Sequence, residues 1–351
     1  ALAVAPSVWS GSWDKNPEHS VAIIGGGIAG LTAAYELQKK NIPCVIYEAD
    51  KRTGGRIKTK TDFVAGLTTD FGAEFVDSTH TDLLEYLEEF KIETYDIRTD
   101  TLEKDTFFYQ GKFYSPKEVV KAYKKILPKI IDDQTKTEED DAYFEKIDYT
   151  PLDTYFESLN GDTWFIKIIE KSYESEYGSN ISEQSAINFL SMMLPQVGKT
   201  FEVFGQSDEA LKIKGGSTQL VEALTEKVKD KIKLNYKLTA IKQKHDKYHL
   251  FFENGEEIKA HYVLMTLPFT LLRSIPLEIN EMTENKKKCI QDLGYGTNVK
   301  LIQKFDKKTW REQHCQVLNP DNGPYTEKKY VFPLEIFILP ANNAPMKIKG
   351  L

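Results

Sequence analysis

The stretch that decides the fold is VAIIGGGIAGLTAAYELQKKNIPCVIYE, residues 21–48. Its first four residues form a continuous apolar run, which predicts a buried parallel strand. Gly25, Gly27 and Gly30 follow with the spacing G-x-G-x-x-G, and apolar residues then recur at helical spacing. Strand, glycine turn and helix in this order are typical of a dinucleotide-binding fold.

Each glycine of this turn has its own physical reason. The first permits a tight turn, the second lets a pyrophosphate approach the backbone, and the third lets helix and strand pack closely. The helix N-terminus adds free N–H groups and a positive dipole end, and we assign Ala29 to the same phosphate-binding turn. Glu48 ends a second apolar strand. Its carboxylate is expected to accept hydrogen bonds from ribose hydroxyls and to repel a 2′-phosphate, which argues against NADP.

A second glycine motif, Thr53-Gly54-Gly55-Arg56, follows closely. Two glycines allow close backbone approach, and Arg56 can donate a planar fork of hydrogen bonds to a diphosphate. The combination GGGIAGLTAAYEL…YEADKRTGGR resembles the flavin-containing amine oxidase family. The resemblance implies FAD as the cofactor. It assigns FAD binding to Gly25, Gly27, Ala29, Gly30, Glu48, Gly55 and Arg56.

Two further segments acquire a role from the resemblance. FGAEFVDSTH, residues 71–80, is similar to the segment that runs along the flavin ring, which would place Gly72, Ala73 and Glu74 near the isoalloxazine. Residues 214–275 are similar to the second FAD-binding segment, in which Leu238 would contact the adenine through its backbone. An ordinary hairpin with a tight turn at Asn254-Gly255 explains the latter pattern equally well.

The stretch LGYGTNVKL, residues 293–301, contains the catalytic candidate. Val299 and Leu301 bracket Lys300, so we expect a strand in which Lys300 points away from them. From the residues alone, Lys300 could equally be a lysine at a sheet edge whose stem lies along apolar surface. In the resembled family the pattern LGYG…K places a lysine that hydrogen-bonds a water beside flavin N5, and this resemblance makes Lys300 the catalytic candidate.

The implied reaction is oxidation of an amine. A hydride leaves the α-carbon for the flavin, the imine gives an aldehyde and ammonia, and O2 becomes hydrogen peroxide. L-Amino acid oxidases often carry a substrate-binding arginine where this chain has Glu74-Phe75, which favours an amine without a carboxylate, and Glu74 could attract a second ammonium. An L-amino acid oxidase, a related desaturase or isomerase, and an inactive or partial flavoprotein that acts as a binding module or as one chain of a heteromer remain open.

Composition restricts the class of protein. A length of 351 residues predicts two domains, and the net charge of −7 argues against nucleic acid as a partner. No window approaches the roughly 20 apolar residues of a membrane span. The three cysteines and six histidines show no disulfide or metal-ligand spacing. The first residues, ALAVAPSVWSGSW, look like the tail of an export signal, so we expect a periplasmic or secreted protein, with a cytoplasmic one as the alternative.

The expected fold class is α/β: a Rossmann-like FAD-binding domain, residues 18–78 and 213–270, with a discontinuous α+β substrate domain, residues 79–212 and 271–351. Helical spacing dominates residues 79–212, strands are expected over residues 271–310, and the acidic stretch DDQTKTEEDD, residues 132–141, is expected to be a solvated loop. The resemblance ends after Trp310. We therefore expect the family's last FAD segment to be missing, through truncation or because a companion chain supplies it, and a homodimer is a further possibility.

Overall fold

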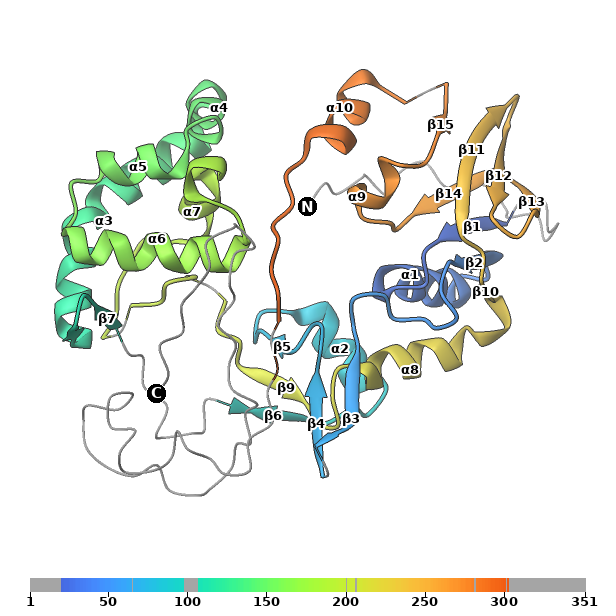
Figure 1. Ribbon diagram of the computed structural model, residues 1–351, viewed down its shortest axis with the longest axis horizontal. Helices are drawn as coiled ribbons and strands as arrows, with labels where there is room; N and C mark the ends of the chain where they lie inside the picture. The colour runs from blue at the N-terminus through green and yellow to red at the C-terminus, as the bar shows by residue number, and fades with distance from the viewer. Residues whose placement is uncertain are drawn as a thin grey trace. The chain divides into compact units, whose positions relative to one another are not determined.

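A computed structural model describes residues 20–64, 66–97, 107–199, 201–205, 207–280, 282–300 and 302. The stretch that resembles an export signal and the segment after Trp310 lie outside these residues. The described chain divides into two compact units (Figure 1). The first unit comprises residues 20–74, 82–94 and 213–294, and the second comprises residues 75–81, 95–212 and 295–302.

A four-stranded parallel sheet organises the first unit. Its central strand β1 (Val21–Ile24) pairs with β2 (Cys44–Glu48) on one side and with β14 (Tyr262–Met265) on the other. Strand β10 (Ile232–Leu234) extends the sheet beyond β2, which gives the order β10-β2-β1-β14. All four residues of β1 are buried, as a strand covered on both faces requires. The Rossmann-like α/β class is confirmed.

Different elements cover the two faces of this sheet. Helix α1 (Ile28–Lys39) packs against β1 and β2 and also contacts α8 (Thr218–Lys227). On the other face, Ala22 and Ile24 share a buried cluster with Leu250 and Phe252 of a second sheet. That sheet has the order β13-β12-β11-β15, formed by Glu257–Ala260, Lys247–Phe252, Leu238–Lys244 and Leu277–Glu278. The predicted tight turn at Asn254-Gly255 joins β12 to β13, with a φ of 85° at Gly255.

The first unit includes segments that the sequence analysis assigned to the substrate domain. Helix α2 (Thr81–Glu89) is tied to α1, since the Tyr86 hydroxyl donates to Glu36 at 2.7 Å and the Lys39 ammonium donates to Glu89 at 3.1 Å. Residues 271–294 also belong here, whereas residues 75–78 belong to the second unit. Which unit binds the substrate stays a prediction. The remaining elements of the first unit are β3 (Thr59–Val64), β4 (Leu67–Asp70), η4 (Lys229–Lys231), α9 (Phe269–Leu272) and α10 (Glu284–Asp292).

Helices dominate the second unit, as predicted for residues 79–212 (Figure 1). Their apolar faces form one core around Tyr123, Phe165 and Phe189. The helices are α3 (Pro116–Glu139), α4 (Asp141–Asp148), α5 (Leu152–Ser158), α6 (Thr163–Tyr177), η3 (Ile181–Glu183) and α7 (Ala186–Met192). The strands are β5 (Phe75–Val76), β6 (Thr94–Asp96) and β9 (Leu211–Ile213), in the order β5-β9-β6, and the hairpin of β7 (Phe107–Tyr109) and β8 (Lys112–Tyr114).

The prediction of strands over residues 271–310 is wrong for most of the described part. Residues 284–292 form helix α10, and residues 293–300 form neither helix nor strand. The Thr283 hydroxyl accepts from the N–H of Lys286 and caps the helix. This capping signal was present in the sequence and favours a helix over residues 284–292.

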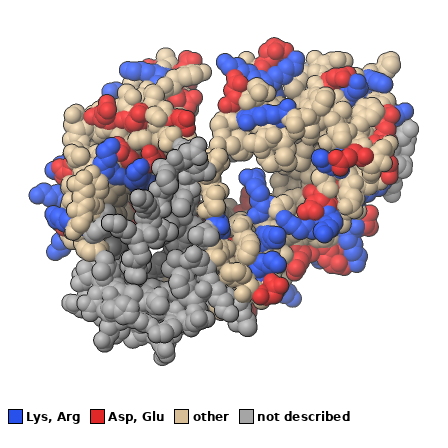
Figure 2. Space-filling view, in the orientation of Figure 1, with Lys and Arg blue, Asp and Glu red and all other residues tan. Residues whose placement is uncertain are grey.

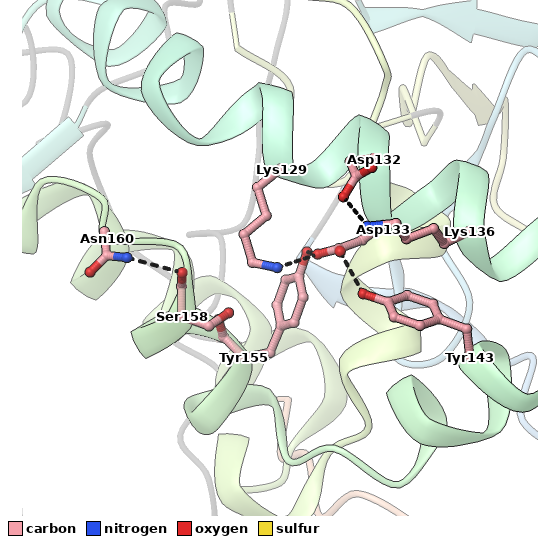
Figure 3. Close-up of polar contacts among 8 residues, drawn as sticks. All are labelled: Lys129, Asp132, Asp133, Lys136, Tyr143, Tyr155, Ser158 and Asn160. Carbon is pink, nitrogen blue, oxygen red and sulfur yellow. Dashed lines mark hydrogen bonds and ion pairs between the residues drawn. The ribbon is translucent and has the colours of Figure 1, made fainter.

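The prediction of a solvated acidic loop at residues 132–141 is also wrong. Residues 132–139 continue α3, and Asp140 caps the start of α4. Asp133 is only 1% exposed. Its carboxylate accepts hydrogen bonds from the Lys129 ammonium at 2.8 Å and from the hydroxyls of Tyr143 and Tyr155 at 2.7 and 2.8 Å (Figure 3). The acidic stretch, which was expected to be solvated, therefore includes one buried anion, Asp133, whose hydrogen bonds connect α3, α4 and α5.

The surface carries both signs of charge. Figure 2 shows acidic and basic side chains interspersed on the visible face of the described residues. Many of them pair, as in the contact of Lys125 with Asp162 at 2.5 Å. Such exposed pairs contribute little to stability, about 0–1 kcal/mol each, so a buried carboxylate such as Asp133 matters more to the energetics of the second unit.

The Asp133 network gives a test of the second unit. Asp133→Ala should lower the free energy of unfolding by about 3 kcal/mol, because two buried hydroxyls and an ammonium lose their acceptor. Asp132→Ala is the matched control, since Asp132 is exposed and forms a surface ion pair with Lys136 in the next turn, so its effect should stay below about 0.5 kcal/mol. Urea unfolding measures both, and equal effects would contradict the network.

The same carboxylate predicts a pH dependence. Burial alone would raise the pKa of Asp133, but the hydrogen bonds from Lys129, Tyr143 and Tyr155 outweigh it and lower the pKa. An aspartate in the unfolded chain has a pKa of about 3.9. The stabilisation of the fold by the ionised Asp133 is therefore fully present above that pH, and it is lost as the pH falls through the lower pKa that Asp133 has in the folded protein. Urea unfolding at pH 6 and pH 3 should show the difference between wild type and Asp133→Ala shrink at the lower pH.

Candidate dinucleotide site

A cavity of about 440 Å³ lies in the first unit, where β1 and β2 end and α1 begins. In open parallel sheets, ligands bind at this carboxyl edge of the strands. The predicted site residues that line the cavity are Gly25, Gly27, Ala29, Glu48, Gly55, Arg56 and Leu238. Residues from three separate stretches of chain therefore meet at one opening.

The structure agrees with the roles predicted for Gly25 and Gly30, and it leaves room for the role predicted for Gly27. Gly25 has a φ of 109°, which favours glycine. A Cβ atom at Gly30 would lie 2.0 Å from the carbonyl oxygen of Gly25, so α1 can pack on β1 only without a side chain there. A Cβ atom at Gly27 would meet nothing within 4 Å, so Gly27 faces open space in the cavity. That space admits a diphosphate against the backbone.

The N-terminus of α1 is available to an anion. Gly27 is the N-cap and no side chain caps the helix, while Ile28 and Ala29 of the first turn line the cavity. The first N–H groups of a helix have no intrahelical partners, and the helix dipole adds about 0.3–1 kcal/mol for a negative charge. Backbone N–H groups and the dipole together suit the phosphates of a dinucleotide.

Glu48 is held at the end of β2 by two backbone groups. One carboxylate oxygen accepts from the N–H of Gly26 at 2.5 Å, and the other accepts from the N–H of Asp50 at 2.8 Å. A carboxylate has about four acceptor positions, so it can still accept from ribose hydroxyls. The carboxylate is therefore oriented before any ligand arrives.

The second glycine motif packs directly on the first. The N–H of Gly54 donates to the carbonyl of Gly26 at 2.8 Å, and Gly54 forms an isolated parallel bridge with Gly27. Gly55 has a φ of 55°, and a Cβ atom there would lie 3.4 Å from the Cα atom of Gly27. The exposed Arg56 follows and lines the cavity. Two glycine loops and an arginine thus surround the place where the diphosphate is expected.

Sequence reasoning missed Arg52, which organises this second loop. Its guanidinium donates to the carbonyl of Thr53 at 2.9 Å and to that of Gly55 at 2.8 Å. The Arg52 guanidinium therefore holds the backbone of the loop without lining the cavity, whereas Arg56 lines it. The available signal in the sequence was an arginine two residues before the glycine pair, directly before the second glycine motif.

Sequence reasoning also missed Asp70, which is 6% exposed. Its carboxylate accepts from the Thr59 hydroxyl and, at 3.0 Å, from the N–H of Ser217 at the start of α8. The Thr59 hydroxyl in turn accepts from the N–H of Thr218 at 3.0 Å. A carboxylate at a helix N-terminus stabilises the helix, because it accepts hydrogen bonds from free backbone N–H groups and its charge interacts favourably with the positive end of the dipole. Asp70 thus fixes the start of α8.

Helix α8 in turn supports the second glycine loop. The hydroxyls of Thr53 and Thr225 lie 2.9 Å apart. A Cβ atom at Gly54 would lie 3.0 Å from a methyl group of Val221, so the loop rests closely on the helix. The position of Gly55 and Arg56 at the cavity therefore depends on Asp70, which does not line the cavity itself.

The wall around Leu238 is largely apolar. Leu238 is 5% exposed and begins β11, whose pairing with β12 is irregular between Leu238 and Ala240. The rings of Tyr47 and Tyr236 lie nearby with their centroids 5.4 Å apart, and both residues line the cavity. Burial raises the pKa of Tyr47 to about 12, so its phenol stays neutral. An apolar wall next to an interrupted strand suits the flat adenine ring and is consistent with the predicted backbone contact of Leu238.

The segment predicted to run along the flavin ring lies beside Arg56. A Cβ atom at Gly72 would lie 1.8 Å from the carbonyl oxygen of Arg56, so only glycine fits, and the N–H of Ala73 donates to the same carbonyl at 3.4 Å. Gly72, Ala73 and Glu74 do not line the cavity. Their placement near the isoalloxazine stays a prediction.

Lys300 belongs to the second unit and is half-buried. It is not in a strand, because the preceding residues pack against the end of α6 instead of pairing with another strand. The N–H of Thr297 donates to the carbonyl of Gly178 at 2.9 Å, and the Asn298 amide donates to the carbonyl of Glu176 at 3.1 Å. The catalytic role of Lys300 stays a prediction.

The described residues contain neither a metal-binding cluster nor a membrane-spanning helix. No group of three or more His, Cys, Asp or Glu side chains in them could hold a metal ion. In the same part of the chain, no helix combines the length and the apolar character that crossing a bilayer requires.

Gly27 and Gly30 give a matched test of the cavity. Gly27→Val should lower FAD affinity by about 100-fold with little loss of stability, because Gly27 has an ordinary φ of −73° and its new side chain would enter only the open space. Gly30→Ala should instead destabilise the fold, since its methyl group would clash with the carbonyl of Gly25. Titration of flavin fluorescence and thermal unfolding separate the two effects. Normal FAD binding by Gly27→Val would place the diphosphate elsewhere.

Asp70 gives a test of the support beneath the loop. Asp70→Ala should weaken FAD binding about tenfold and lower the free energy of unfolding by about 2 kcal/mol, because Ser217 and Thr59 lose a buried acceptor. The control is Asp62→Ala on the neighbouring strand, which should change neither quantity, because Asp62 is exposed and forms a surface ion pair with Lys60. An Asp70→Ala protein that loses stability but keeps its FAD affinity would contradict the inference that Asp70 holds the second glycine loop in place through α8.

Comparisons with known proteins identify the family of this chain. Residues 28–345 match the model of the family described as flavin containing amine oxidoreductase. The flavin-containing amine oxidase A of Canis lupus familiaris is 26% identical over 336 residues, which cover 87% of this chain and 60% of that protein. A probable flavin-containing monoamine oxidase A of Dictyostelium discoideum is 24% identical, with 87% and 70% covered. The match extends to residue 345, so the expectation that the resemblance ends at Trp310 is wrong.

Two solved structures share the fold. Wild-type putrescine oxidase bound to putrescine has a TM-score of 0.67 at 19% identity, with 84% of this chain and 67% of that chain covered. Cyclohexylamine oxidase from Brevibacterium oxydans has a TM-score of 0.65 at 18% identity, with 78% and 63% covered. This chain spans about 60% of the length of the first curated relatives it matches. It belongs to the flavin-containing amine oxidoreductase family, and the family implies FAD as its cofactor.

Proposed function

We propose that this protein oxidises an amine that carries no carboxylate, with FAD as the hydride acceptor. The imine product would hydrolyse to an aldehyde and ammonia, and O2 would be reduced to hydrogen peroxide. The observation that carries the proposal is the cavity formed by two touching glycine loops and Glu48, in a chain of the flavin-containing amine oxidoreductase family.

The residues of the cavity fit the ADP part of FAD. Glu48, already oriented by two N–H groups, would accept hydrogen bonds from the ribose. The open space over Gly27 and the N-terminus of α1 would receive the diphosphate, with the guanidinium of Arg56 donating to it. The backbone of Leu238 would contact the adenine. FAD supplies the hydride acceptor and the route of electrons to O2 when it is bound.

Lys300 would act on the reaction through its charge. By the resemblance, its ammonium would hold a water by a hydrogen bond in the catalytic centre, and a positive charge there favours the negative charge that develops during O2 reduction. The substrate nitrogen must arrive unprotonated, because its lone pair assists the loss of hydride. A dry site among aromatic side chains would favour the neutral amine, since burial disfavours the charged form.

Two observations support an amine without a carboxylate. The structural neighbours are named putrescine oxidase and cyclohexylamine oxidase, and neither of these substrates carries a carboxylate. Glu74 stands where L-amino acid oxidases often carry an arginine, and its charge would repel a substrate carboxylate. The same charge would attract the second ammonium of a diamine.

The decisive experiment is a peroxide-release assay on the full chain after incubation with FAD. Tyramine, putrescine, spermidine and a set of L-amino acids are compared. We expect peroxide with at least one amine and none with the amino acids. Peroxide from L-amino acids alone would replace the proposal with an L-amino acid oxidase. Bound FAD that no substrate reduces would favour a flavin-binding module or one chain of a heteromer.

Lys300→Met tests the catalytic assignment. Reoxidation of the reduced flavin by O2 should slow by about 100-fold, because the positive charge that assists O2 reduction is lost, while FAD affinity stays unchanged. Stopped-flow absorbance follows each half-reaction separately. The control is Lys199→Met, since Lys199 is an exposed lysine of the same unit. Equal reoxidation rates in Lys300→Met and wild type would remove Lys300 from the mechanism.

A further inference from the structure

The peptide group between Gly25 and Gly26 lies in the glycine turn and is held on both sides. Its N–H, which belongs to Gly26, donates to the Glu48 carboxylate at 2.5 Å. Its carbonyl, which belongs to Gly25, accepts from the hydroxyl of Thr266 at 3.2 Å. A peptide group is planar, and its N–H and its carbonyl point in opposite directions. The two contacts therefore favour one orientation of this group.

Thr266 directly follows strand β14 and lines the cavity. Its backbone N–H donates to the carbonyl of Ile24 at 3.0 Å, which continues the pairing of β14 with β1 by one residue. The same carbonyl accepts from the Thr266 hydroxyl at 2.9 Å, so the single hydroxyl proton is shared between the carbonyls of Ile24 and Gly25. The backbone bond thus holds the threonine where its side chain reaches the turn.

Glycines on both sides leave this peptide group unusually free to rotate. Its rotation changes ψ of Gly25 and φ of Gly26, and glycine adopts positive and negative φ about equally readily. After rotation, the carbonyl of Gly25 would point toward the Glu48 carboxylate, so that two acceptors would face each other. The N–H that orients Glu48 would point away from it. A rotated turn would therefore no longer hold the carboxylate that is expected to bind the ribose.

The carbonyl of Gly25 lies in close-packed surroundings. A Cβ atom at Gly25 would lie 2.6 Å from the hydroxyl oxygen of Thr266, and a Cβ atom at Gly30 would lie 2.0 Å from the carbonyl oxygen of Gly25. The carbonyl thus fits between the backbone of α1 and the threonine side chain. A methyl group in place of the hydroxyl would fill the same space but would donate no hydrogen bond.

We propose that Thr266 is a positioning residue for FAD. Its hydroxyl holds the peptide group between Gly25 and Gly26 in the orientation that directs the Gly26 N–H to Glu48. All four residues belong to the first unit. No motif in the sequence indicated Thr266, and the inference rests on the proposed function only for the placement of the ADP part of FAD in the cavity.

The first test uses the full chain without FAD. Thr266→Val should speed hydrogen exchange of the Gly26 amide about tenfold, because the peptide group rotates away from Glu48 more often. Thr266→Ser keeps the hydroxyl and should exchange like wild type. The control is Thr239→Val, which removes a hydroxyl that donates to the carbonyl of Phe251 at 3.0 Å in the same unit and should leave Gly26 unchanged. NMR of protein labelled with 15N-glycine measures the rates, and unchanged exchange in Thr266→Val would overturn the proposal.

The second test measures binding by titration calorimetry. Thr266→Val should weaken the binding of FAD about tenfold and that of ADP by the same factor, because the glycine turn and Glu48 serve the ADP part of the cofactor. Thr266→Ser and Thr239→Val should bind both ligands within about twofold of wild type. A Thr266→Val protein that binds ADP like wild type would contradict the positioning role.

Failure of this inference can be told apart from failure of the proposed function. If wild type binds FAD but oxidises no amine, the proposed function is wrong, and a weaker binding of FAD and ADP by Thr266→Val still supports the positioning role. If wild type and Thr266→Val bind FAD equally well, the inference alone is wrong. If wild type binds neither FAD nor ADP, the assignment of the cavity is wrong and the inference is wrong with it.

Discussion

The contact between the two glycine loops is the constraint on which the candidate site depends. The N–H of Gly54 reaches the carbonyl of Gly26 at 2.8 Å, and the two backbones run close enough to form a bridge between Gly54 and Gly27. A side chain at Gly54 would press against α8. The contact brings Arg56 to the same opening as the N-terminus of α1, and this pairing of an arginine with a helix N-terminus makes the cavity suitable for a diphosphate.

Much of what maintains this contact lies away from the cavity. Arg52 holds the outer side of the second loop, and Asp70 fixes the start of α8, on which the loop rests. These residues make buried or charge-assisted hydrogen bonds, which are among the stronger polar interactions in proteins. Binding to a preformed cavity costs less free energy than binding to a cavity that the ligand must order. Such supporting residues therefore contribute to the affinity for the ligand without contacting it.

The second unit also depends on buried hydrogen bonds, which here lie within a core of helices. Its helices bury the carboxylate of Asp133, which accepts hydrogen bonds from an ammonium and two hydroxyls. A buried anion is tolerated only when its hydrogen bonds are complete, so the network restricts how α3, α4 and α5 can pack. The segment that contains Lys300 rests on the C-terminal end of α6 in this unit. Backbone and side-chain hydrogen bonds thus hold this segment within the second unit.

The sequence by itself determined the parallel strand, the glycine turn, α1, and Glu48 at the end of β2, because these features are local: an apolar run, residues without side chains and helical spacing act over a few neighbouring positions. Local capping also explains why the strands expected after residue 271 are replaced by α10. Only the tertiary structure decided that Asp133 is buried, that Asp70 meets Ser217 and that Thr266 reaches the carbonyl of Gly25. Asp70 and Ser217 are 147 positions apart in the sequence. From sequence alone a charged residue is expected to be exposed to solvent, because its buried hydrogen-bond partners become apparent only in the folded structure.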